Sequence, residues 1–270
     1  MLHYKNESDL KIGYREVIGK GQQMNFLRLS ILQLSEDFRE YSGQTGEEEC
    51  AIVPLYGNVK VTCGSNEVGV VGGRDSVFSK PADLAYIPTH SRYSVAISDN
   101  SQSAKLLVCR TVAERHFDPF IVRGSEAEVV QRGRGQWTRI VRNILVDKYE
   151  GKVDRLILGE TINSPGQWSG YPPHRHVYDN PPYELPFEEI YYYEFQPKDG
   201  FGVQVHYGSK YGEDRGYLIR SGDAFAIPDG YHPVVAAGGY SLYYLWFMAG
   251  PKGRKLLPYL DPDHTAVDKL

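Results

Sequence analysis

The chain of 270 residues has few cysteines, no long hydrophobic run and little excess charge. Its cysteines, Cys50, Cys63 and Cys109, form no CxxC pair, and so sparse a set fits a reduced cytoplasm better than a disulfide framework. No apolar run reaches the roughly 18 residues of a membrane helix, and the first residues lack the order of a signal peptide. Lysine plus arginine number 30 against 34 for aspartate plus glutamate, which argues against nucleic acid as a partner.

What the sequence has in excess is aromatic and turn-forming residues. It contains 21 tyrosines, 28 glycines and 16 prolines. The glycines and prolines are scattered singly, so they separate many short elements and do not form a linker. Tyrosine favours strands over helices. The composition therefore predicts an all-β protein.

Several segments alternate apolar and polar residues in the way of half-buried strands. Each is short and bounded by glycine, proline, aspartate or asparagine. Examples are residues 26–32, 138–145, 155–161, 189–195, 201–207 and 241–248. Only residues 126–136 and the tail after Lys252 are expected to be helical or irregular. Many short strands of this kind predict a sandwich or a barrel.

A weak internal repeat divides the chain in two. The segment 83–88 reappears 140 residues later as 223–228, and the same offset pairs Val95 with Val235 and Glu49 with Glu189. A duplication of this kind predicts two barrels in tandem, residues 1–125 and 126–270. The join falls where clean alternation is lost, near residues 112–130.

The histidines suggest a metal site. On a strand, His174 and His176 point to one face, so two imidazoles lie side by side, although two surface histidines would give the same pattern. Glu188 or Glu189 opens the next β segment, and His232 follows a tight turn. Inward-facing residues of successive strands converge in a small barrel. Three histidines and one carboxylate would leave a metal position open for substrate.

These residues resemble a known family. Gly222, Pro228, Gly230 and His232 are similar to the second cupin motif, and His174-x-His176 followed by a glutamate is similar to the first, with an unusually long spacing. The stretches Tyr-Pro-Pro-His-Arg-His and Pro-x-Gly-Tyr-His-Pro are more specific. They resemble the 5-deoxyglucuronate isomerases of myo-inositol catabolism, which are akin to the ketol-isomerases of uronate breakdown. The resemblance is dense from about residue 155 to 253.

The resemblance implies a bicupin with one metal-bearing barrel. It assigns His174, His176 and His232 as ligands, and Glu189 in preference to Glu188, because the family's glutamate precedes a small or β-branched residue and then aromatics. Zinc is the implied metal, and the same ligands accept Mn, Fe, Co or Ni. At the 140-residue offset His232 falls on Arg92. The first barrel is therefore expected to be metal-free.

The resemblance also implies a reaction. A cytoplasmic aldose–ketose isomerase would convert 5-deoxyglucuronate to 5-dehydro-2-deoxygluconate, with no organic cofactor and no nucleic acid or membrane partner. Glu184 is a candidate base, or a loop carboxylate. Tyr191 and Tyr193 either line the pocket or pack the barrel. A metal-dependent dioxygenase and a sugar-acid-binding protein without turnover remain alternatives.

Two further expectations concern the substrate carboxylate and the assembly. A uronate needs a cationic partner, and the candidates are Arg142, Arg155, Arg175 and Arg215, of which Arg175 points away from the two histidines. The sequence does not choose among them. A homo-oligomer is expected, because exposed strand edges in cupins are often covered by a partner.

Overall fold

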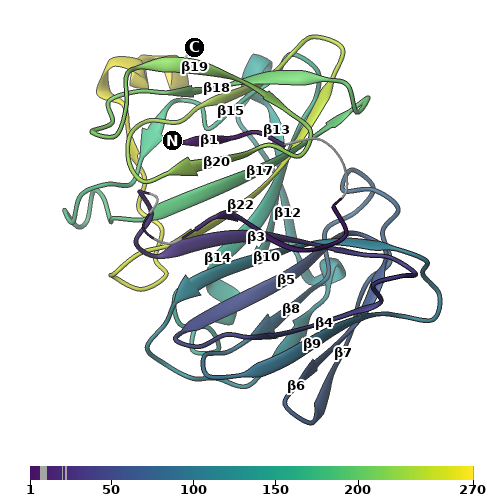
Figure 1. The fold of residues 1–270 in the computed structure, drawn as a ribbon. Helices are drawn as coiled ribbons and strands as arrows, with labels where there is room; N and C mark the ends of the chain where they lie inside the picture. Colours follow the sequence, from purple (N-terminus) through teal and green to yellow (C-terminus); the bar gives the residue numbers. More distant parts are fainter. Residues whose placement is uncertain (7–10, 20, 22, 270) are drawn as a thin grey trace.

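Strands account for nearly all regular structure in the computed structural model, which describes residues 1–6, 11–19, 21 and 23–269. Within this described part the sheets form two halves, one above the other in Figure 1, and the other regular elements are short 3-10 helices. The prediction of an all-β protein is confirmed. None of the described helices is long and apolar enough to cross a membrane.

The second half of the chain builds a large and a small sheet. The seven-stranded sheet has the order β1 (His3–Tyr4), β20 (Ala224–Ile227), β17 (Glu188–Gln196), β22 (Ser241–Ala249), β14 (Ile157–Asn163), β13 (Arg139–Leu145) and β12 (Glu128–Arg132). The small sheet has the order β15 (Trp168–Ser169), β21 (Val234–Ala236), β18 (Phe201–His206) and β19 (Arg215–Arg220). One core contains side chains from both sheets, including Tyr193 of β17 and Val234 of β21, so the sheets face each other.

The first half repeats this plan. Its larger sheet has the order β11 (Phe120–Val122), β8 (Leu84–Ile87), β5 (Glu48–Tyr56), β10 (Ala104–Val112), β3 (Leu27–Leu34) and β2 (Gly13–Ile18). Its smaller sheet has the order β4 (Glu40–Gln44), β9 (Arg92–Ile97), β6 (Asn58–Cys63) and β7 (Asn66–Gly72). A separate core lies between these two sheets.

Short elements complete the described chain. They are β16 (His174–Arg175), which pairs with β23 (Tyr259–Leu260), and the 3-10 helices η1 (Gly124–Glu126), η2 (Gly135–Trp137), η3 (Asp147–Tyr149) and η4 (Pro262–Lys269). The segment 126–136, expected to be helical or irregular, contains strand β12. Its residues are mostly exposed, so they lack the apolar face that marks a strand in the sequence.

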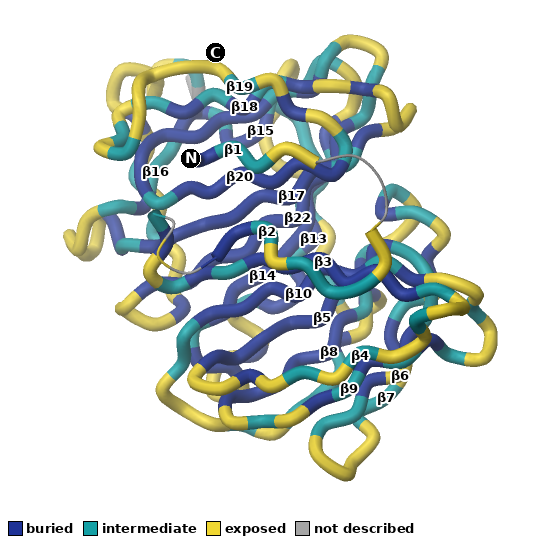
Figure 2. Tube along the Cα trace, viewed as in Figure 1, coloured by how far each residue is buried: buried dark blue, intermediate teal, exposed yellow. Residues whose placement is uncertain are grey.

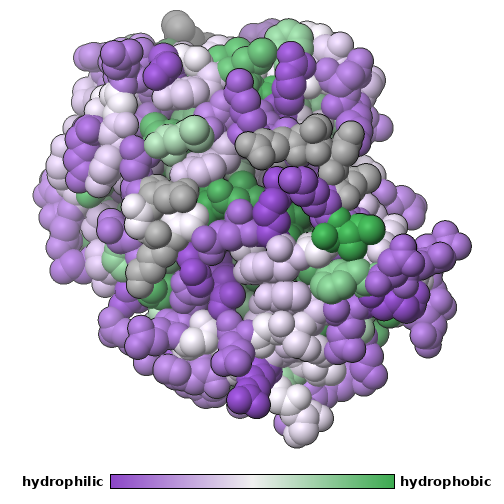
Figure 3. Space-filling model, in the orientation of Figure 1, coloured by the Kyte–Doolittle hydropathy of each residue, from purple (hydrophilic) through white to green (hydrophobic). Residues whose placement is uncertain are grey.

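A third core joins the two halves. Alternation along β17 places Tyr191 and Tyr193 inside the second barrel, whereas Ile190 and Tyr192 pack against the first half in a core shared with Ala51 of β5. The large sheets are therefore covered on both faces, which Figure 2 shows as dark blue strands at the centre. On the face shown in Figure 3, hydrophobic residues form small separate patches in a mostly hydrophilic surface.

The strand pairing supports the 140-residue repeat in one region and corrects it in another. Val95 and Val235 take the same place in their small sheets, and His90 and Gly230 both have positive φ, at 54° and 80°. The offset slips by one residue between β5 and β17. Ile87 pairs with Cys50 and Ile227 with Glu189, so the counterpart of Glu189 is Cys50 and not Glu49.

The N-terminal residues cross between the halves. β1 pairs with β20, and in Figure 1 its purple arrow lies among the green strands of the second half. Asp223 anchors this crossing, because it binds the His3 ring at 2.9 Å and the Asn6 amide at 2.7 Å. The start of the chain thus supplies an edge strand to the second sheet.

Candidate metal centre

Adjacent glutamates on β17 face opposite ways. Glu188 accepts hydrogen bonds from the backbone amides of Asn25, Phe26 and Leu27, so it points toward the first half. Glu189 points into the second barrel, where two histidines meet it. Of the two carboxylates weighed from sequence, the structure brings Glu189 to the histidines.

The second barrel holds a buried group of three possible metal ligands. Nε2 of His176 lies 3.1 Å from Oε2 of Glu189, and Nε2 of His232 lies 3.2 Å from the same oxygen. One ligand atom from each of the three residues lies within 4.8 Å of the others. This spacing lets one ion contact all three.

Backbone carbonyls orient both imidazoles. Nδ1 of His176 donates to the Phe187 carbonyl at 2.7 Å, and Nδ1 of His232 donates to the Gly230 carbonyl at 2.9 Å. Because the carbonyls hold the proton on Nδ1, the neutral form of each ring presents the Nε2 lone pair to the centre, and the protonated form donates from Nε2 to Glu189. Nε2 of His232 is buried and has no hydrogen-bond partner among the described residues apart from its contact with Oε2 of Glu189 at 3.2 Å. Two imidazole lone pairs converging on a carboxylate fit a divalent cation.

The charges of the group reinforce one another. Burial alone would raise the pKa of Glu189, but the hydrogen bonds and charges of His176 and His232 outweigh it and lower that pKa to about 2. Burial lowers the pKa of His176, but the hydrogen bond and charge of Glu189 prevail and raise it. The carboxylate is therefore ionised, and the site favours a positive charge at its centre.

His174 lies beside this group. Its ring centroid is 4.9 Å from that of His232 and 6.3 Å from that of His176. Burial and the charges of these two histidines lower its pKa to about 3, so the ring is neutral at physiological pH. Of the four ligands expected from sequence, three converge and His174 borders them, outside the group of three.

Tyrosines form the wall of the site. The Tyr191 ring lies 6.0 Å from His232 and 4.7 Å from Tyr244. Tyr193 donates its hydroxyl proton to Gln204 at 2.8 Å, whereas the Tyr191 hydroxyl has no hydrogen-bond partner among the described residues. Burial raises the pKa of both tyrosines, so their phenols stay protonated. Gln204 of β18 therefore points into the barrel.

Glu184 is engaged in holding the long loop between β15 and β17. Its buried carboxylate accepts hydrogen bonds from the amides of Val177 at 2.6 Å and Tyr178 at 3.1 Å, and from Nε of Arg175 at 3.3 Å. An arginine and two backbone amides occupy this carboxylate and fix it to the loop, so it is not free to approach a substrate carbon. Its geometry fits the loop carboxylate better than the base, although it is buried and not solvated.

Sequence reasoning missed Arg139, at the start of β13. It lies two residues before Val141, which packs against the core of the second barrel, so both belong to the inward face. Nη1 of Arg139 donates to the carbonyls of Trp137 at 3.1 Å and Tyr171 at 3.2 Å. Alternation within 138–145 could have drawn attention to it, but only once the inward face was known.

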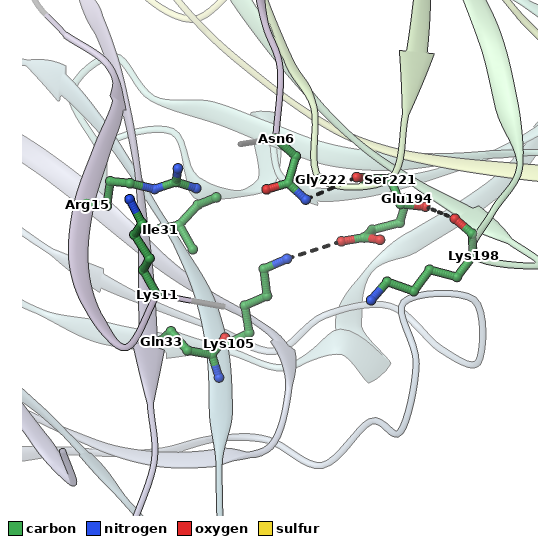
Figure 4. Close-up of a pocket in the computed structure, with 10 residues that line it drawn as sticks. All are labelled: Asn6, Lys11, Arg15, Ile31, Gln33, Lys105, Glu194, Lys198, Ser221 and Gly222. Atoms are coloured by element: carbon green, nitrogen blue, oxygen red, sulfur yellow. Dashed lines mark hydrogen bonds and ion pairs between the residues drawn. The ribbon is translucent and has the colours of Figure 1, made fainter. Parts of the chain in front are cut away.

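A second pocket lies between the halves, away from the metal group. Figure 4 shows Lys11, Arg15, Lys105 and Lys198 around a cavity of about 60 Å³. Lys105 forms an ion pair of 3.5 Å with Glu194, which sits on the face of β17 opposite to Glu189. The pocket and the candidate metal centre therefore use different faces of one strand.

Comparison with known proteins gives consistent relatives. The KduI/IolB family model matches residues 4–267. A 5-deoxy-glucuronate isomerase of Lacticaseibacillus casei is 34% identical over 255 residues, which cover 93% of this chain and 92% of that protein. The crystal structure of an IolB-like protein from Salmonella typhimurium LT2 has a TM-score of 0.89 at 27% identity and 99% coverage of both chains.

A more distant structure bears on the fold alone. The oxalate decarboxylase of Lactobacillus farciminis has a TM-score of 0.63 at 12% identity, covering 100% of this chain and 93% of that one. Together with the repeated strand order, this likeness identifies the fold as a bicupin. The fold class predicted from sequence is confirmed.

Proposed function

We propose that this chain, which belongs to the KduI/IolB family, is a metal-dependent isomerase that converts 5-deoxyglucuronate to 5-dehydro-2-deoxygluconate. The observation that carries the proposal is the buried group of His176, Glu189 and His232 inside a tyrosine-lined barrel. The reaction moves a proton from C2 to C1 of an aldehyde sugar acid, and negative charge develops on the two neighbouring oxygens.

The site chemistry suits that charge. A bound divalent ion would act as a Lewis acid toward the developing charge. Tyr191 contributes a protonated phenol without a hydrogen-bond partner among the described residues, and we propose that it donates to a substrate oxygen. Tyr193, held by Gln204, then shapes the wall beside it.

We propose zinc as the metal and His174 as its fourth ligand. Imidazole nitrogens and one carboxylate are a common zinc ligand set. His174 supports this role because its ring is neutral and adjacent to His232.

We further propose a cytoplasmic homo-oligomer with a metal-free first barrel. The edge strand β12 is mostly exposed along its length, and such an edge can pair with a second copy. Within residues 1–6, 11–19, 21 and 23–269, the one group of three clustered ligands is that of the second barrel.

The test combines metal analysis with a direct assay. Purified protein is analysed for bound metals and incubated with 5-deoxyglucuronate while carbon NMR follows the aldehyde and a new ketone. We expect one metal ion per chain and a ketone product. In D₂O, deuterium at the former aldehyde carbon would indicate a proton passed through an exchangeable group.

Two results would contradict the proposal. Oxygen consumption without ketone would assign a dioxygenase. Binding of the sugar acid by metal-loaded protein, with no change in its spectrum, would assign a binding protein.

A further inference from the structure

A uronate brings a carboxylate into the barrel, and the arginines considered from sequence are committed elsewhere. Arg142 is buried and pairs with Glu160 at 3.3 Å, on the face toward the first half. Arg155 pairs with Glu114, and Arg175 with Glu184. The remaining candidate, Arg215, lies in a surface groove with the N-terminal residues 1–5.

Arg139 differs from these four in both place and partners. It starts β13 on the inward face, opposite Asn163 of β14 in the strand register. Its Nη1 is held by the Trp137 and Tyr171 carbonyls, and no carboxylate among the described residues pairs with it. Neutral carbonyls orient the guanidinium without cancelling its charge, so Nε and Nη2 remain for a ligand.

Contacts through the segment 168–174 connect Arg139 to the metal group. The Tyr171 carbonyl that accepts from Arg139 stands two residues after Ser169, whose hydroxyl hydrogen-bonds that of Tyr244. The Tyr244 ring lies 4.7 Å from that of Tyr191, and the Tyr191 ring lies 6.0 Å from that of His232. The carbonyl of Tyr171 also ties Arg139 to the segment that leads into His174.

We infer that Arg139 binds the carboxylate of the sugar acid and so selects uronates over neutral sugars. This inference rests on the proposed function and deepens it. The reacting carbons sit at one end of the substrate and the carboxylate at the other. A guanidinium fork matches a carboxylate with two parallel hydrogen bonds, which gives geometry as well as charge. The metal group and Arg139 would then hold the two ends of one extended molecule.

The experiment compares 5-deoxyglucuronate with its primary amide, which has the same shape and no charge. Wild-type protein, Arg139→Gln and Arg139→Lys are assayed on both compounds, with metal content measured for each. Arg132→Gln is the matched control, because Arg132 is exposed on the neighbouring strand opposite Arg139. We expect Arg139→Gln to lower kcat/KM for the uronate by about 100-fold and leave the amide nearly unchanged.

The accompanying outcomes decide the inference. Arg139→Lys keeps the charge but loses the fork, and should fall between wild type and Arg139→Gln on the uronate. Equal losses on uronate and amide, or loss of metal from Arg139→Gln, would overturn the inference and make Arg139 a support for the His174 segment. If wild type turns over neither compound, the proposed function fails. In that case the ratio of the binding affinities for the uronate and its amide, measured by calorimetry for wild type and Arg139→Gln, still tests the role of Arg139.

Discussion

The two barrels share one strand scheme and differ in what fills equivalent places. Cys50 of β5 and Glu189 of β17 occupy the same position, each paired with the last residue of the neighbouring strand. Cys50 is buried among apolar side chains, and burial raises its pKa to about 12. Glu189 is buried against two imidazoles. One frame thus supports an inert core in one half and a polar centre in the other.

The other differences lie in loops. Only residues 45–47 join β4 to β5, whereas residues 170–187 join β15 to β17 and carry His174 and His176. Arg92, at the place of the buried His232, is exposed at the start of β9. The candidate ligand set therefore depends on the long connection 170–187 and on the residues at the positions of Glu189 and His232. The strands around these residues are common to both halves.

Elsewhere the two halves are reciprocal. Glu49 accepts hydrogen bonds from the backbone amides of Asp154, Arg155 and Leu156 in the second half. Its counterpart Glu188 accepts the amides of residues 25–27 in the first half. Each barrel therefore inserts a buried carboxylate into the other.

Removing one candidate metal ligand should have the largest effect on activity. It should abolish metal binding in the second barrel and leave the first barrel unchanged. His176→Ala leaves Glu189 and His232 without their partner, so metal should be lost. Because Lewis-acid stabilisation is worth several kcal/mol, turnover should fall by about 10³-fold or more. Metal analysis measures the bound ion and the NMR assay measures turnover. Circular dichroism should show that the fold is retained. His90→Asn, at an exposed turn of the first barrel, is the control; full metal content in His176→Ala would refute the ligand assignment.

Placing a carboxylate in the first barrel should break its inert core. Cys50→Glu buries a charge where Arg110 is already paired with Glu48, so the free energy of unfolding should fall by about 3 kcal/mol. No additional metal should bind, because the histidine loop is absent. Urea unfolding and metal analysis test both points, with Cys50→Ala as control. A second bound metal ion per chain would show that the shared strand scheme with one carboxylate is enough to bind metal without the histidine loop.

Glu49 and Glu188 should contribute equally to the free energy of unfolding. Glu49→Gln and Glu188→Gln each keep the shape but lose the charge that strengthens three amide hydrogen bonds. Each should lower the free energy of unfolding by about 2 kcal/mol. Urea unfolding compares them, with Glu67→Gln, on an exposed strand of the first half, as control. If either variant unfolded at the same free energy as wild type, the two carboxylates would not have equivalent roles.

The smallest expected effect is a pH dependence confined to the second barrel. The raised pKa of His176 stabilises metal-free protein below its unfolded value near 6.5 and loses that contribution as pH rises. The lowered pKa of Glu189 adds stability above its unfolded value near 4.3 and loses it only toward about 2. The lowered pKa of His174 works in the opposite direction, so a matched variant isolates the ion pair: chelator-treated wild type should lose more stability between pH 6 and pH 8 than chelator-treated His176→Asn.

Tryptophan fluorescence can follow this effect, because Trp137, Trp168 and Trp246 all belong to the second half of the chain. Thermal midpoints are compared at pH 6 and pH 8. Metal-loaded wild type should instead gain stability from pH 6 to pH 8, since imidazoles must lose their protons to bind metal. Equal changes in metal-free wild type and metal-free His176→Asn would contradict the ion pair.

Local pattern was enough for much of this protein. Alternation located the strands near 26–32, 189–195 and 241–248, and motif spacing identified the family and the bicupin fold, because strand period and turn chemistry act over a few residues. The motifs also pointed to Glu189 before its surroundings were visible, and the structure sets it beside His176 and His232.

Tertiary structure alone decided the remaining features. The one-residue slip that matches Cys50 to Glu189, the crossing of β1 into the second sheet and the engagement of Glu184 all depend on partners elsewhere in the fold. Arg139 is a further case, since alternation assigns it to a face but not to the metal group. Which face is inward, and which strand lies opposite, is set by packing between segments far apart in sequence, and no local pattern records that packing.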